Sequence, residues 1–156
     1  MKKVFKKIVA IAFIAFLLMQ LYQPVRTIDY GPVPALDFMN AYAVPTKVET
    51  ILKTSCYDCH SNTTNYPWYS NIQPARMLMD SHIKEGKENL NFSEWGNYSL
   101  RKQGNKLNEI SKQIKKGEMP LTSYTLIHRN AILTSVQKEE VVQWIDKMKD
   151  SLSSKK

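Results

Sequence analysis

Residues 56–60 read Cys56-Tyr57-Asp58-Cys59-His60, and the rest of the chain is interpreted from this stretch. C-x-x-C-H is the pattern by which proteins hold a c-type haem. Two cysteines three residues apart face the same way on a helix, so each thiol can form a thioether to one haem vinyl group. His60 can then place an imidazole nitrogen on the iron. The pattern uses both cysteines of the chain, so the sequence predicts one covalently attached haem c, with His60 as a metal ligand.

Three other chemistries use a close pair of cysteines. A thioredoxin-like redox pair needs a βαβ setting, and no such pattern surrounds the motif. A structural zinc site needs four ligands, and His82 or His128 would have to complete it without a second close pair. A disulfide between Cys56 and Cys59 would suit an exported interaction domain, and it stays open as the reading without haem.

The sixth ligand of the iron is expected from a loop. Met119 follows a predicted helix end, and Pro120 fixes the chain there so that the thioether can turn inward. A methionine between helices differs from one on an apolar stripe, which fills the core. Met119 is therefore predicted to bind the haem iron, with His82 and His128 as the alternatives.

Aromatic side chains gather in the two loops on either side of the second predicted helix. These residues, Tyr66, Trp68, Tyr69 and Trp95, fit either packing around a cofactor or ordinary core packing. Arg76 is the nearest guanidinium to the motif, and a bond to a haem propionate is one role for it. A solvated side chain is the alternative, and the sequence favours it.

The N-terminus predicts export. Four lysines among the first seven residues precede an almost wholly apolar run over Ile8–Tyr22, and Pro24 ends any helix. A basic segment followed by a short apolar one is typical of an export signal. Because no cleavage site follows closely, residues 1–23 are expected to be an uncleaved helix spanning the bacterial inner membrane, with the lysines inside and the domain in the periplasm. Cleavage of this segment stays open.

The charge of the remaining chain does not indicate nucleic-acid binding. The net charge is +8, but beyond residue 22 there are 18 basic and 14 acidic residues, which leaves +4. No dense lysine and arginine stripe and no nucleic-acid reading motif occurs.

Helical periodicity predicts an all-α domain. Residues 24–45 carry four prolines and are expected to be a linker, and residues 46–151 to be the haem-binding domain. Helices are predicted from Thr46 into Cys56, from Pro74 to Gly86, around Leu107 to Gly117, and after an N-cap at Ser135, with long loops between them. No alternating strand pattern is present.

The chain resembles the bacterial haem-binding domain family of short exported monohaem c-type proteins. The resemblance covers roughly residues 46–150 and implies a periplasmic, helical, cytochrome c-like fold that binds haem. It rests on Cys56-x-x-Cys59-His60-Ser61-Asn62, Tyr66-Pro67-Trp68-Tyr69, Asn91-Phe92-Ser93-x-Trp95, Gly117-Glu118-Met119-Pro120 with Tyr124, His128, and Trp144-Ile145.

These features predict that the protein transfers single electrons to or from redox partner proteins in the periplasm or membrane. They favour an electron carrier over a catalyst. With His60 and Met119 both on the iron, no site is open for peroxide or oxygen. A haem peroxidase or gas sensor with a labile sixth ligand is the alternative.

Overall fold

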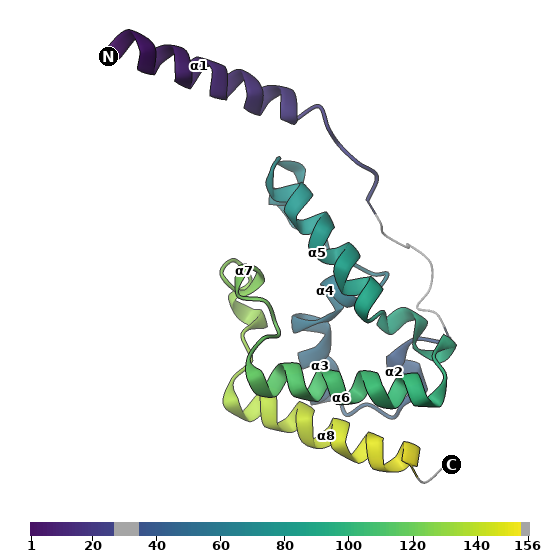
Figure 1. Ribbon diagram of the computed structural model, residues 1–156. Helices are drawn as coiled ribbons and strands as arrows, with labels where there is room; N and C mark the ends of the chain where they lie inside the picture. The colour runs from purple at the N-terminus through teal and green to yellow at the C-terminus, as the bar shows by residue number, and fades with distance from the viewer. Residues whose placement is uncertain (27–34, 154–156) are drawn as a thin grey trace.

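The protein is all-helical over the part of the chain that the structure describes. The computed structural model describes residues 1–26 and 35–153, and in them only α-helices and short 3-10 helices occur, with no strand (Figure 1). The longer helices are α1 (Lys2–Met19), α3 (Thr46–Ser55), α5 (Ala75–Asn89), α6 (Leu100–Lys116) and α8 (Ser135–Ser153). The predicted all-α class is confirmed.

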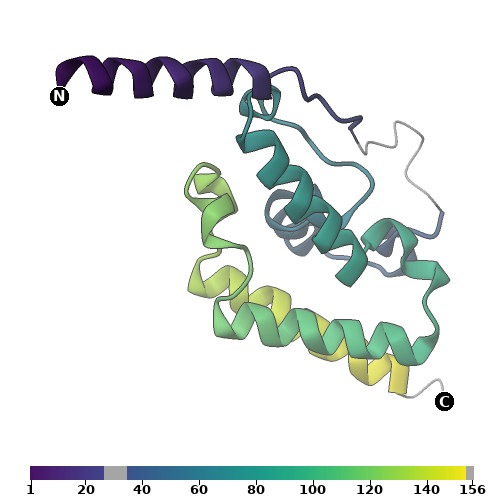
Figure 2. The same cartoon turned by 45° about the horizontal axis from the view of Figure 1, so that its top comes forward.

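Helices α6 and α8 pack along each other and form one side of the domain (Figure 2). Leu107 and Ile114 of α6 and Val141 and Ile145 of α8 recur at helical spacing and are buried. Gly117 ends α6 in the left-handed conformation, with φ of 71°, which glycine adopts without steric cost. This stop turns the chain back toward α3, so the loop that follows can reach the cysteine motif.

An aromatic cluster fixes the other side of the core. Phe38 is 1% exposed, and its ring centroid lies 4.7 Å from that of Trp95 and 5.0 Å from that of Phe92. Phe38 belongs to α2 (Phe38–Ala41), while Phe92 and Trp95 lie in η2 (Phe92–Asn97). The core therefore already includes residues that the sequence analysis places in the linker over 24–45.

Residues 20–26 lie against the N-terminal end of α5. Gln73 is fully buried and donates from Nε2 to the Tyr22 carbonyl at 2.7 Å, and its backbone amide donates to Gln20 Oε1 at 2.9 Å. Arg76 is also buried and donates to Gln23 Oε1 and to the Pro24 carbonyl. The segment after α1 is thus held by side chains of the domain.

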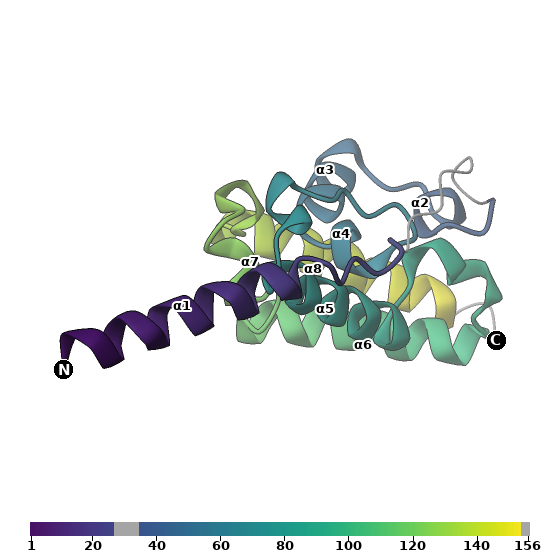
Figure 3. The ribbon, with the colours of Figure 1, turned by 90° about the horizontal axis from the view of Figure 1, so that it is seen from above.

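Helix α1 projects away from the other helices (Figure 3). It has no buried residue, and its apolar part begins only at Ile8, after the lysines. From Ile8 to Met19 the helix rises about 18 Å, against a hydrocarbon core of about 30 Å. Within residues 1–26 and 35–153, no helix combines the length and apolar character that crossing a membrane requires, so the expected transmembrane helix is not supported.

Candidate cofactor site

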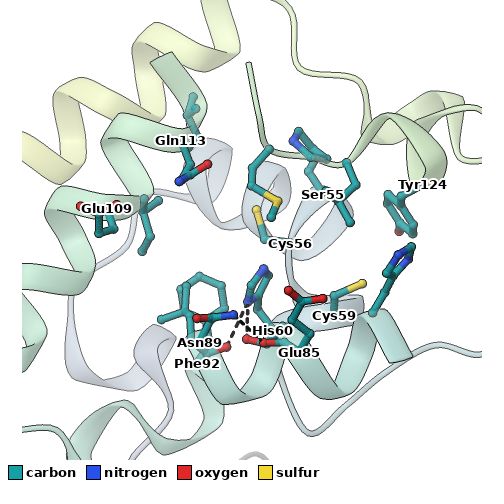
Figure 4. Close-up of a pocket in the computed structure, with 18 of the residues that line it drawn as sticks. Ser55, Cys56, Cys59, His60, Glu85, Asn89, Phe92, Glu109, Gln113 and Tyr124 are labelled. Atoms are coloured by element: carbon teal, nitrogen blue, oxygen red, sulfur yellow. Dashed lines mark hydrogen bonds between the residues drawn. The ribbon is translucent and has the colours of Figure 1, made fainter. Parts of the chain in front are cut away.

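The cysteine motif forms a short helix of its own. Helix α3 ends where Cys56 leaves helical geometry, with φ of −129°, and α4 (Tyr57–His60) follows directly. The backbone amides of Cys59 and His60 both donate to the Cys56 carbonyl, at 3.2 and 3.0 Å. This tight turn brings both thiols and the imidazole to one cavity of about 390 Å³ (Figure 4).

His60 is oriented by two backbone carbonyls near the end of α5. Its Nδ1 lies 3.0 Å from the carbonyl oxygen of Gly86 and 3.0 Å from that of Leu90 (Figure 4). Both carbonyls can only accept, so the ring carries its proton on Nδ1 and leaves the lone pair of Nε2 free for a metal. Burial also lowers the pKa of His60 below its usual value, which favours the neutral ring that binds metals.

The two thiols are half-buried and unpaired. Burial raises the pKa of Cys56 to about 12 and that of Cys59 to about 11, so both stay protonated at neutral pH. The structure has no bond between them. Within the described residues, no three His, Cys, Asp or Glu side chains gather where they could hold a metal ion.

Met119 lines the same cavity from the loop between α6 and α7 (Thr122–Thr125). The amides of Glu118 and Met119 both donate to the Gln113 carbonyl, at 3.0 and 3.4 Å, which fixes the start of this loop. His82 lines the cavity as well, from α5. His128 is not among the lining residues, and its Nε2 lies 2.5 Å from the Tyr69 hydroxyl. The structure thus brings together Cys56, Cys59, His60 and Met119, while the identity of the sixth ligand stays a prediction.

The walls of the cavity suit a flat, largely apolar group with a charged edge. The apolar lining comes from Leu90, Phe92, Ile110, Ile114, Pro120 and Leu121. The polar side chains of α6, Lys106, Glu109 and Gln113, also line it, and Figure 4 shows Glu109 and Gln113 on the side away from Cys59. This set of residues would suit a haem, since Cys56 and Cys59 would bond its vinyl groups and Lys106 would pair with its carboxylates.

The surroundings of the cavity differ from the expectations at Arg76 and Trp68. Arg76 points to residues 23–24 and to Asp80 rather than to the cavity, because the segment after α1 occupies its guanidinium. Trp95 belongs to the aromatic core, which is one of its two expected roles, whereas Trp68 is 76% exposed and has neither role. Tyr124 and Phe92 are the aromatic residues of the lining.

The sequence analysis missed Lys106 as a lining residue. The signal was present, since Lys106 and Ile110 are four apart and share a face of α6. A lysine on the same helix face as apolar residues indicates that this face lines a cavity or binds a ligand and does not only pack in the core.

Comparison with known proteins agrees with this site. A cytochrome c peroxidase, Ccp, from Escherichia coli (strain K12) is 29% identical over 97 residues, covering 60% of this chain. The chain spans only 21% of the length of that relative. The search of solved structures found no significant match. The haem-binding domain family matches residues 14–147, which is most of the chain and includes every residue of the cavity. The chain belongs to the haem-binding domain family.

Proposed function

We propose that the chain carries one haem c, bound covalently through Cys56 and Cys59, with His60 and Met119 as iron ligands, and that it transfers single electrons. The observation that carries this proposal is one cavity lined by two thiols, a thioether and an imidazole with a free Nε2. When bound, the haem supplies an iron that exchanges one electron between its ferric and ferrous forms.

The protein's own part is to fix and close the site. The carbonyls of Gly86 and Leu90 hold the His60 ring in one tautomer, and the apolar lining would pack against the faces of a bound haem. With both the Met119 thioether and the His60 imidazole as ligands, a bound haem iron would have a raised reduction potential and no position for an added ligand. These features support an electron carrier rather than a catalyst.

A second candidate function is peroxide reduction or gas sensing with a labile sixth ligand. His82 lines the cavity, and a relative of this chain is a cytochrome c peroxidase. His82 would be the lining residue able to exchange a proton with a small molecule held in the cavity.

We also place the domain on the periplasmic side of the bacterial inner membrane, where redox proteins of the periplasm or membrane would exchange electrons with it. The support is the basic segment and apolar run at the N-terminus, which is the pattern of an export signal. A reporter fused after Lys156 that is active only when exported should be active here. Activity of a reporter that works only in the cytoplasm would contradict this placement.

The test of the axial ligand compares two methionine variants of the haem-loaded protein. The oxidised wild type should show the weak far-red band of a sulfur-to-iron charge transfer and should bind carbon monoxide poorly. Met119→Ala should lose the band, bind carbon monoxide and lower the reduction potential. Met77→Ala is the matched control, because Met77 is 49% exposed and does not line the cavity.

Two results would overturn the assignment. A wild-type protein that binds carbon monoxide readily has an open or labile site, which favours the second candidate. A Met119→Ala spectrum identical to that of the wild type, with opening only in His82→Ala, would make His82 the ligand.

A further inference from the structure

Asp58 lies between the two cysteines, and the loop after α4 orients its carboxylate. Its backbone carbonyl accepts from the Thr64 hydroxyl at 2.8 Å, and its Oδ1 accepts from the Asn65 amide at 3.2 Å. The other oxygen, Oδ2, accepts from the Tyr124 hydroxyl at 2.7 Å. A short bond from a neutral hydroxyl to a carboxylate is among the stronger protein hydrogen bonds.

Tyr124 sits on α7, five residues after Met119. Helix α7 is a single turn that packs mainly against η3 (Arg129–Ala131), at one end of the α6–α8 pair (Figure 2). The Met119 loop is thus held at its start by the Gln113 carbonyl, and just beyond its end by the bond of Tyr124 to Asp58.

A second contact orients the Tyr124 ring. The ring stacks on His128 with centroids 4.2 Å apart and planes 11° apart, and His128 Nε2 lies 2.5 Å from the Tyr69 hydroxyl. Burial raises the pKa of Tyr124 and that of Tyr69, so both hydroxyls keep their protons and remain donors. The segment after Met119 is therefore linked to the rest of the domain in two ways. Tyr124 bonds to Asp58 in α4, before the loop over residues 61–67, and His128 contacts Tyr69, after that loop.

We propose that Asp58 and Tyr124 are positioning residues that hold Met119 at the sixth coordination site. This inference rests on the proposed function, in which Met119 binds the iron. Because Asp58 lies between two cysteines that are both attached to the haem, its carboxylate is a fixed point beside the cofactor. The bond from Tyr124 ties the methionine loop to that point and opposes the loop motion that would open the iron.

Tyr124→Phe and Asp58→Ala in the haem-loaded protein test this inference. Phenylalanine keeps the ring that stacks on His128 and removes only the hydroxyl, so folding should survive, which far-ultraviolet circular dichroism checks. Each variant should weaken the far-red methionine band and raise the apparent affinity for carbon monoxide about tenfold, which corresponds to about 1.4 kcal/mol. The double variant should rise no further than either single one, because both changes remove the same bond.

Tyr66→Phe is the matched control, since the Tyr66 hydroxyl also donates to an aspartate, Asp80, but neither residue lines the cavity. It should keep the wild-type band and carbon monoxide affinity. The inference is overturned if wild type shows the methionine band and both Tyr124→Phe and Asp58→Ala leave band and affinity unchanged, or if their effects add fully in the double variant. A wild type that lacks the band and binds carbon monoxide overturns the proposed axial ligand, and this inference with it.

Discussion

Gly86 lies where α5 passes the cysteine helix, and an added methyl group there has no room. A Cβ built at Gly86 would lie 2.6 Å from the Cys59 carbonyl oxygen, about 0.8 Å short of the 3.4 Å at which ordinary contact begins. It would also lie 3.3 Å from Cys59 Cβ. Because the closest atom belongs to the backbone, no rotamer change relieves the clash, and α5 must move away from α4.

Two opposing effects set the magnitude for Gly86→Ala. Alanine in a helix interior is favoured over glycine by about 1 kcal/mol. Overpacking a tight site costs about 1–3 kcal/mol, and a backbone contact this short belongs at the upper end. The shift also strains the bond from His60 to the Gly86 carbonyl. We therefore expect a net loss of about 2 kcal/mol in the free energy of unfolding, since the clash outweighs the gain in helix propensity.

Gly104→Ala is the matched control. Gly104 is also inside a helix, α6, but no atom outside its own helix backbone and chain neighbours lies within 4 Å of its added Cβ. This change should stabilise the protein by about 0.5–1 kcal/mol. Urea unfolding of the haem-loaded variants, followed by circular dichroism, measures both changes. The reasoning is refuted if Gly86→Ala is at least as stable as wild type while Gly104→Ala behaves as expected.

Three further predictions concern stability. Removing residues 1–19 should leave the urea unfolding midpoint unchanged, because α1 has no buried residue. Removing residues 1–26 should lower the midpoint, because it exposes Gln73 and Arg76, the buried partners of residues 20–24. Equal midpoints for the two deletions would contradict this. Phe38→Ala should lower the free energy of unfolding by about 3–5 kcal/mol, because the ring is buried in the core although the sequence analysis places Phe38 in a linker. A loss under about 1 kcal/mol in urea unfolding would contradict this core position. In haem-free protein, burial lowers the pKa of His60, so the unfolded chain takes up the proton first and stability should fall as pH drops below about 6.5. His60→Gln should lack this part of the pH dependence, and an unchanged profile would refute the assignment.

The helices with a clear apolar period could be predicted from the sequence. Val48, Ile51 and Leu52 are buried on one face of α3 as expected, and Gly117 ends α6. The start of α8 was misplaced by one residue. Thr134 and Gln137 form a reciprocal capping pair, in which each side chain accepts from the other's backbone amide, so the predicted cap Ser135 is the first residue of the helix.

The core residue Phe38 could not be predicted, because α2 is one turn long and carries no period. Its stability comes from the N-terminal cap by Asp37 and from ring contacts with residues more than fifty positions away. The same holds for Arg76, whose partners in residues 23–24 lie far away in the sequence. Long-range partners leave no local pattern.

Among the site residues, Cys56, Cys59 and His60 are adjacent in sequence, so their spacing alone indicates the chemistry. Placing Met119 at the cavity required a further inference, namely that the helix ends at Gly117 and the following loop turns toward the cysteine motif. The bond between Tyr124 and Asp58 joins residues 66 positions apart, and no spacing rule could have found it.

The covalent attachment of haem is tested most directly by mass spectrometry of the protein after acid–acetone extraction. Protein made with a cytochrome c maturation system should keep the mass of one haem, and a proteolytic fragment containing both Cys56 and Cys59 should carry it. Cys56→Ser combined with Cys59→Ser should have the mass of the polypeptide alone. A wild-type protein that loses all its haem on extraction, or one whose two cysteines remain alkylable after loading, would contradict the account.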